Sequence, residues 1–182
     1  MPLVRRKQWS AVKPNYPVPP LRSLPARYAL IETTGGYQCL NTHRCSQVVL
    51  SIQAARVFNG LNDIAYNFLV GGDGLLYEGL GWNKAGYSAG SLNSYAISVA
   101  FVGNFTLDLP NPQQINSTKM LLEGAVRANQ LAPDYKLMLV SQVAEGDTAG
   151  PRLTSLVRSW PHWSECDPVC QQIKKADEQD DF

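Results

Sequence analysis

Few side chains in this sequence are suited to metal binding or nucleophilic chemistry. The 182 residues include two histidines and four cysteines. His162, Cys166 and Cys170 are spaced by four residues, which on a helix would place all three on one face as zinc ligands. Pro168 interrupts such a helix, and Cys166 and Cys170 lie close enough in sequence to pair with each other. We therefore favour a disulfide here over a metal site.

The other two cysteines, Cys39 and Cys45, close the short loop CLNTHRC. An even count that divides into two close pairs predicts two local disulfides, which is typical of an oxidising, extracellular compartment. Asn104 and Asn116 begin Asn-Phe-Thr and Asn-Ser-Thr tripeptides, which are acceptor sequences for glycosylation. These features predict a protein that is secreted or the ectodomain of a membrane receptor.

One tyrosine, Tyr66, stands in an apolar run that breaks into a glycine-rich turn, DIAYNFLVGGDG. The segment YNFLV, the turn GGDG and the segment LLYEG together predict a β-hairpin whose glycines supply the positive φ angles of a tight turn. The Tyr66 hydroxyl is therefore held on a strand, where it either takes part in a site or packs against its neighbours.

The elements that would position these side chains alternate along the chain. Apolar and β-branched runs predict strands at 28–34, 95–103 and 136–143, and apolar residues at helical spacing predict helices at 45–58, 112–130 and 154–160. With the hairpin, this order predicts an α/β fold, a central mixed β-sheet flanked by three helices. We expect one domain over residues 1–165 and a tail over 166–182, which holds a cysteine pair and then the disordered segment KKADEQDDF.

Length and composition exclude several classes of protein. A chain of 20.0 kDa with 45% hydrophobic residues is long enough for one well-buried core. Its formal net charge of +1 provides no field to attract nucleic acid. No apolar run approaches the ~20 residues needed to span a bilayer. The first twenty residues carry cations with no apolar stretch behind them, so we expect any signal peptide to have been removed or to lie upstream.

Several motifs in their order along the chain resemble the peptidoglycan recognition protein family. They are KQWSA, the Cys39 to Cys45 loop, DIAYNFLVGGDGLLYEGLGWN, ISVAFVGNF, LAPDYKL and SWPHW, and they cover Val4 to Trp163. The resemblance implies the amidase-like fold of that family, in which helices flank a mixed sheet and a groove on one face takes the muropeptide. That fold agrees with the order of elements expected above.

Catalytic members of this family are zinc amidases that cleave the bond between N-acetylmuramic acid and L-alanine. Their chemistry needs three protein ligands and an open fourth position for an activated water. The resemblance places the two histidine ligands at Glu32 and Val140, and the cysteine ligand at Thr148; the tyrosine near the water is retained as Tyr66. Because valine and a neutral threonine cannot replace the missing ligands, we expect no bound metal, no cofactor and no amidase activity.

The residues that contact muropeptide in the family are only partly retained. The family's arginine in YEGRGW, which binds the extra carboxylate of diaminopimelic acid, is Leu80, and leucine offers no bidentate fork. A histidine in the family's Gly-Ala-His stretch is Ser88. The ligand-binding residues that the resemblance implies are Tyr66, Trp82, Asn83, Lys84, Ser88 and Asn93.

Three functions compete at this point. The first is a non-catalytic pattern-recognition domain that binds peptidoglycan fragments and feeds an innate immune signalling receptor. The second is a co-receptor or decoy domain with a degraded groove, which pairs with another recognition domain as a heterodimer or homodimer, with weak or ligand-bridged binding. The third, a zinc N-acetylmuramoyl-L-alanine amidase, is disfavoured by the replaced ligands.

Overall fold

The computed structural model describes residues 2–145 and 149–180. Across these residues the chain forms six strands, four α-helices and two short 3₁₀ helices. In chain order they are β1 (Leu3–Val4), β2 (Ala26–Thr33), α1 (Thr42–Phe58), β3 (Phe68–Val70), β4 (Leu76–Glu78), η1 (Gly90–Tyr95), β5 (Ala96–Phe101), α2 (Pro112–Arg127), β6 (Leu131–Leu139), η2 (Val140–Gln142), α3 (Pro151–Arg158) and α4 (Pro168–Asp180).

The strands form one mixed sheet in the order β1-β4-β3-β5-β2-β6. Strands β3, β5, β2 and β6 run parallel to one another, and β4 runs antiparallel to β3. The predicted α/β class and mixed sheet are therefore confirmed. The parallel strands end at the same edge of the sheet, where open α/β sheets commonly bind their ligands.

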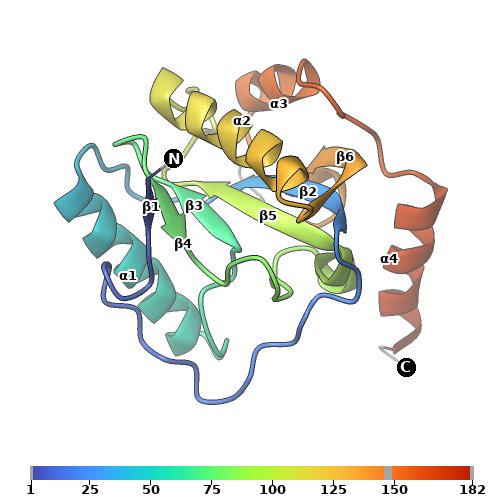
Figure 1. Cartoon of the computed structure of the whole chain (residues 1–182), viewed down its shortest axis with the longest axis horizontal. Helices are drawn as coiled ribbons and strands as arrows, with labels where there is room; N and C mark the ends of the chain where they lie inside the picture. Colours follow the sequence, from blue (N-terminus) through green and yellow to red (C-terminus); the bar gives the residue numbers. More distant parts are fainter. Residues whose placement is uncertain (1, 146–148, 181–182) are drawn as a thin grey trace.

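Helices cover both faces of this sheet (Figure 1). Helices α2 and α3 pack on one face, against the side chains of alternate strand residues such as Ile31 and Val99. Helix α1 packs on the other face, over a cluster that includes Tyr66 and Leu69. Because side chains alternate along a strand, this arrangement fixes which strand residues can reach each face.

The expected hairpin is present as β3 and β4, and its glycines act in two different ways. Gly74 has φ +77, which is the left-handed conformation that the sequence predicts for the turn. Gly72 instead allows a close approach of two backbones, because an added Cβ would lie 2.0 Å from the carbonyl oxygen of Cys39. The turn is thereby packed against the loop that the Cys39–Cys45 disulfide closes.

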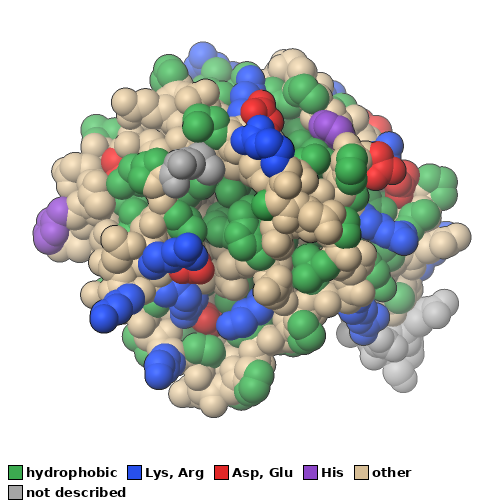
Figure 2. Space-filling model, in the orientation of Figure 1, with side chains coloured by type: hydrophobic (Ala, Val, Ile, Leu, Met, Phe, Trp, Pro, Cys, Tyr) green, Lys and Arg blue, Asp and Glu red, His purple; other side chains and the backbone are tan. Residues whose placement is uncertain are grey.

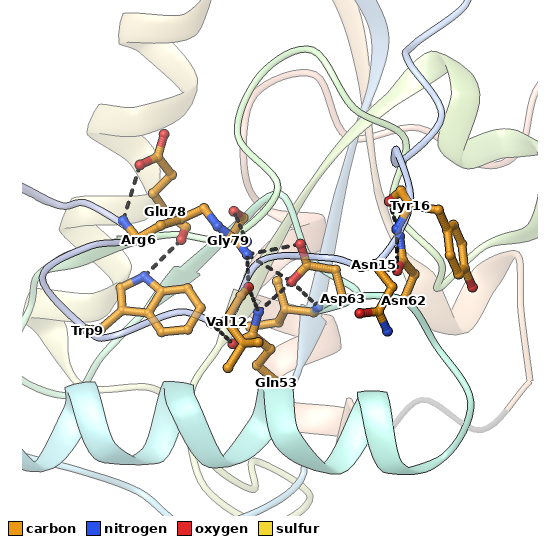
Figure 3. Close-up of polar contacts among 11 residues, drawn as sticks. Arg6, Trp9, Val12, Asn15, Tyr16, Gln53, Asn62, Asp63, Glu78 and Gly79 are labelled. Carbon is orange, nitrogen blue, oxygen red and sulfur yellow. Dashed lines mark hydrogen bonds and ion pairs between the residues drawn. The ribbon is translucent and has the colours of Figure 1, made fainter.

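The N-terminal segment is joined to the sheet and α1 by buried polar contacts (Figure 3). The Arg6 guanidinium pairs with Asp63 at 3.0 Å and donates to the carbonyl oxygens of Gly79 and Val12. Asp63, which is 1% exposed, also accepts from Gln53 on α1 and from the backbone of Ile64. These contacts hold the N-terminal segment, which contains the KQWSA motif, against α1.

Further contacts hold the same segment at each end. The indole N–H of Trp9 donates to the carbonyl oxygen of Glu78 on β4 at 3.0 Å, and its ring is buried. Asn62 accepts from the backbone N–H of Asn15 and donates to the carbonyl oxygen of Tyr16. Residues before the first long strand are therefore part of the folded domain.

Disorder was expected for residues 174–182, but residues 168–180 form helix α4, a fourth helix beyond the three predicted; residues 181–182 lie outside the described residues. Pro168 begins this helix instead of breaking it, since the first helical position needs no backbone donor. Asp167 caps the helix by accepting from the backbone N–H of Cys170 at 2.8 Å. Cys170 and Ile173 pack with η1 and β2, so this helix continues the domain past residue 165.

The face of the molecule shown in Figure 2 carries charged side chains of both signs. Figure 2 shows hydrophobic side chains gathered near the centre of one face, over the strands between α1 and α2, with Lys and Arg side chains below them and acidic groups among these. This mixture agrees with the formal net charge of +1.

Candidate functional site

The structure brings Glu32 and Val140 together at the carboxyl edge of the sheet. Ile31 on β2 lies opposite Leu139 on β6, and the two strands are parallel. Glu32 directly follows Ile31 and Val140 directly follows Leu139, so Glu32 and Val140 lie side by side on neighbouring chain segments. Their face of the sheet is opposite to the one that α2 and α3 cover, because Ile31 and Leu139 point toward those helices.

Both of these side chains are buried, but their surroundings differ. Glu32 is 4% exposed, and one of its oxygens accepts from the hydroxyl of Ser88 at 2.7 Å. Such a bond is needed because a buried carboxylate without partners is costly. Val140 is 3% exposed and packs among apolar side chains of β2, η1 and α4, including Leu30 and Leu92. One position thus presents a carboxylate and the other an aliphatic group.

Tyr66 lies on the same face as Glu32, with its hydroxyl bound by an arginine. Arg56, in the last turn of α1, donates to the Tyr66 hydroxyl at 2.7 Å, and its guanidinium carbon lies 5.5 Å from the ring centroid. The backbone N–H of Tyr87 donates to the carbonyl oxygen of Ala65, so Ser88 and Tyr66 lie on adjoining segments. Arg56 was missed from sequence, where it reads only as a cation favoured at a helix end.

Glu32, Ser88 and Val140 lie at the carboxyl edge, and Tyr66, just before β3, lies on the same face with Arg56 bound to its hydroxyl; we call these five residues the carboxyl-edge site. It offers one buried carboxylate, one half-buried guanidinium and two hydroxyl groups. Such groups can hydrogen-bond a polar ligand, and the guanidinium can bind a carboxylate.

The described residues of this site do not fit a catalytic zinc ion. Zinc requires nitrogen, sulfur or oxygen ligands, and Val140 has none to offer. Among the side chains that the structure describes, three or more His, Cys, Asp or Glu side chains nowhere lie close enough together to hold a metal. Thr148, the third expected position, lies outside the described residues.

The alternative metal site at the C-terminal end is also ruled out by pairing. Both predicted disulfides are present, with Cα atoms 5.0 Å apart for Cys39–Cys45 and 5.3 Å apart for Cys166–Cys170. Cys166 and Cys170 are therefore not zinc ligands. His162 stacks on the ring of Tyr135 instead, with ring centroids 4.1 Å apart.

Three of the expected ligand-binding residues, Trp82, Asn83 and Lys84, lie in the loop after β4. Trp82 packs on Phe68, with ring centroids 4.3 Å apart, in the cluster on the α2 face of the sheet. Asn83 and Lys84 lie further along this loop, which is fixed by Asn67, since Asn67 donates to the carbonyl oxygen of Lys84 at 2.7 Å.

Two further positions have roles inside the fold. Asn93 is 3% exposed and donates to the carbonyl oxygen of Gly90 at 2.8 Å, which stabilises the 3₁₀ helix η1. Leu80 is 6% exposed and packs in the cluster beneath α1 with Trp9 and Tyr66. Leu80 therefore offers almost no side-chain surface to a ligand. Of the six expected residues, Tyr66 and Ser88 belong to the carboxyl-edge site.

Comparison with known proteins relates both this fold and its motifs to one family. A family model described as N-acetylmuramoyl-L-alanine amidase matches residues 22–153. Peptidoglycan-recognition protein SC1a/b of Drosophila simulans is 37% identical over 161 residues, which cover 88% of this chain and 82% of that protein. The chain belongs to the peptidoglycan recognition protein family.

Solved structures of this family superpose closely on the chain. The crystal structure of Drosophila peptidoglycan recognition protein SD gives a TM-score of 0.87 at 36% identity and covers 91% of this chain and 98% of that one. The ectodomain complex of peptidoglycan recognition proteins LCa and LCx with tracheal cytotoxin gives a TM-score of 0.86 at 32% identity and covers 90% and 99%. Like the family's amidase-like fold, the chain combines a mixed sheet with flanking helices.

Two further findings concern the helices and the predicted glycosylation sequences. Within residues 2–145 and 149–180, no helix combines the length and the apolar character needed to cross a bilayer. The first asparagine of the predicted glycosylation sequences, Asn104, is exposed, and so is the second, Asn116.

Proposed function

We propose that this chain is a non-catalytic recognition domain for bacterial peptidoglycan, which binds muropeptide and passes the signal to an immune receptor. The observation that carries the proposal is that Glu32 and Val140 lie side by side at the carboxyl edge. One of these two positions is aliphatic, and the carboxylate of the other is already bonded to Ser88. A zinc amidase needs metal ligands at such positions, so recognition without cleavage is the function that the residues support.

In this proposal the carboxyl-edge site contacts the peptide part of the muropeptide. Arg56 supplies the positive charge that a peptide carboxylate needs, and the Tyr66 hydroxyl holds its guanidinium in place. The Glu32 carboxyl group is buried, and a negative charge on it would repel ligand carboxylates more strongly than it would in water. Binding of muropeptides rich in carboxylates is therefore weak.

The test uses the purified full chain with insoluble peptidoglycan. We expect the chain to co-sediment with peptidoglycan, to release no peptide from it and to contain no stoichiometric zinc. Restoring the ligand set with Glu32→His, Val140→His and Thr148→Cys should produce zinc binding. Amide cleavage by the unmodified chain would refute the proposal, as would one equivalent of zinc that is lost in Glu32→Gln.

A second function, pairing with another recognition domain around a shared ligand, is favoured by one comparison. The similar solved structure holds the LCa and LCx ectodomains in a complex with tracheal cytotoxin. A domain whose own site repels carboxylates gains affinity when a partner holds the ligand. We expect tracheal cytotoxin to bind this chain more tightly in the presence of the LCx ectodomain than alone, as measured by sedimentation velocity. Equal binding in both cases would exclude pairing and leave a stand-alone receptor.

The proposal also places the domain outside the cell. The two disulfides and the exposed asparagines of the glycosylation sequences, Asn104 and Asn116, support this location, as does the similarity to receptor ectodomains.

A further inference from the structure

A cavity lies on the face of the sheet opposite the carboxyl-edge site. It has a volume of about 540 Å³ and is formed by the C-terminal half of α2, by β6 and by the turn that follows α3. Figure 1 shows α2 beside β6, with α3 nearby. We call it the α2–β6 pocket. Its volume is within the range of small-molecule sites, which is about 300–1,000 Å³.

The lining of the α2–β6 pocket is apolar on its inner side. Leu122 and Leu137 are buried parts of the main core, and Val126 packs against that core from α2. Tyr135 and Trp160 add two aromatic walls. An apolar ligand body would therefore displace water from this surface.

One side of the pocket carries a positive charge with no carboxylate partner. The ammonium group of Lys119 lies 5.1 Å from the centre of the Trp160 ring, and no ion pair to Lys119 exists among the described residues. Arg127, by contrast, lies 3.9 Å from Glu123, which offsets its charge. The formal net charge of these three side chains is therefore +1, because Lys119 and Arg127 are positive and Glu123 is negative.

Trp160 adds an unsatisfied donor at the same place. Its indole Nε1 is buried and has no acceptor within the part of the chain that the structure describes. Buried donors of this kind are rare in folded proteins, because each loses a hydrogen bond to water. The wall beside Lys119 therefore favours an acceptor oxygen that carries negative charge.

We propose that the α2–β6 pocket binds a single-chain amphiphile with an anionic head group. The apolar chain lies over Leu122, Val126 and Leu137, and the head group lies at Lys119 and provides an acceptor for the Trp160 indole. This site is separate from the carboxyl-edge site, so the inference does not rest on the proposed function.

The first test compares three probes by isothermal titration calorimetry with the full chain. Octanoate, used below the concentration at which it forms micelles, has both the chain and the charge. Octanol has the chain alone, and acetate has the charge alone. We expect octanoate to bind one per chain, and octanol and acetate to bind at least tenfold more weakly. Failure of octanoate to bind, or equal binding by octanol or acetate, would overturn the proposal.

Variants of α2 locate the binding site. Val126→Trp fills the pocket from a half-buried position and should weaken octanoate binding at least tenfold. Met120→Trp adds the same ring at an exposed position of the same helix outside the lining and should leave the affinity unchanged. Equal affinity in both variants would place octanoate elsewhere and refute the site. Thermal unfolding of each variant shows whether it is folded.

Two further variants test the polar end of the pocket. Lys119→Glu reverses the charge and should weaken octanoate binding at least tenfold, whereas Lys13→Glu, at an exposed position in the N-terminal segment, should not. Trp160→Phe keeps an aromatic wall and removes the donor, so we expect a loss of about fivefold or more. Muropeptide binding should be unchanged in Val126→Trp, because that ligand uses the other face. If octanoate binds Lys119→Glu and Trp160→Phe as tightly as the unmodified chain, the head-group assignment is wrong.

Discussion

Replacing Arg6 by methionine should destabilise the whole domain, although Arg6 lies in a segment with little regular structure. Its guanidinium pairs with Asp63 at 3.0 Å, and the Asp63 side chain is 1% exposed while that of Arg6 is 27% exposed (Figure 3). The neighbouring residue, Arg5, provides a matched control. It pairs with Glu78 at 3.3 Å, but its own side chain is 65% exposed.

The expected magnitudes follow from burial. Arg6→Met leaves the buried Asp63 carboxylate without a cation, and breaking a buried pair costs about 3–5 kcal/mol. The carboxylate keeps its bonds from Gln53 and Ile64, so we take the lower end, about 3 kcal/mol. At about 2–4 °C per kcal/mol for a chain of this size, the melting temperature should fall by roughly 6–12 °C. Arg5→Met should cost less than about 1 kcal/mol, because exposed pairs contribute little.

Urea denaturation without reductant, followed by tryptophan fluorescence, measures both variants. Asp63→Asn in the Arg6→Met background removes the unpaired charge but keeps an oxygen to accept from Gln53 and Ile64. We therefore expect this double variant to be more stable than Arg6→Met alone. If Arg6→Met and Arg5→Met differ by less than about 1 kcal/mol, or if the double variant is the least stable, an unpaired buried charge is not the cause.

Three other expectations concern the site, the pH dependence and modification. Glu32→Gln keeps an oxygen to accept from Ser88 and removes any negative charge, so calorimetry should show tighter binding of diaminopimelate-type muropeptide. The control Glu123→Gln, at an exposed position on α2 across the sheet from the site, should show no change, and unaltered affinity in Glu32→Gln would contradict the repulsion. Burial, and then the hydrogen bond to Asp167, raise the pKa of Tyr28 to about 12, from an ordinary value near 10. Tyr28 thus contributes stability that is fully present below pH ~10 and is lost as the pH rises to about 12. Between these pH values, the free energy of unfolding of Tyr28→Phe should fall less steeply than that of the unmodified chain. An equally steep fall would exclude this contribution. Asn104 lies exposed in the loop after β5, whereas Asn116 lies in α2 and Thr118 of its acceptor sequence is fully buried. Protein secreted from eukaryotic cells should therefore carry more glycan at Asn104 than at Asn116. Mass spectrometry that finds glycan at Asn116 alone would contradict this expectation.

Local features of the sequence predicted most of the elements. Strand β2, helix α1, the hairpin and helix α2 follow from periodicity and turn residues within short segments. The structure adds the cap of α2, because Asn111, directly before Pro112, accepts from the backbone N–H of Gln114. Both disulfides were predicted for the same reason, since each pair is close in sequence.

The errors arose where a local signal had two meanings. Pro168 was taken as a helix breaker, but it begins α4, because Asp167 before it supplies the cap. The charged composition of residues 174–182 predicted disorder, yet the helix continues to Asp180. Its start is held by a disulfide and by the burial of Cys170 against η1, contacts that composition alone does not show.

By itself, the sequence determined the α/β class, the family motifs and the presence of Glu32 and Val140 in two of the expected strands. Only the tertiary structure decided which side chains share a face. It placed Trp82 on the α2 side of the sheet, brought Arg56 from α1 to Tyr66, and joined Ser88 to Glu32 across 56 residues. These outcomes depend on strand register and on where the chain returns to the sheet, because side chains alternate between faces and a shift of one residue exchanges them.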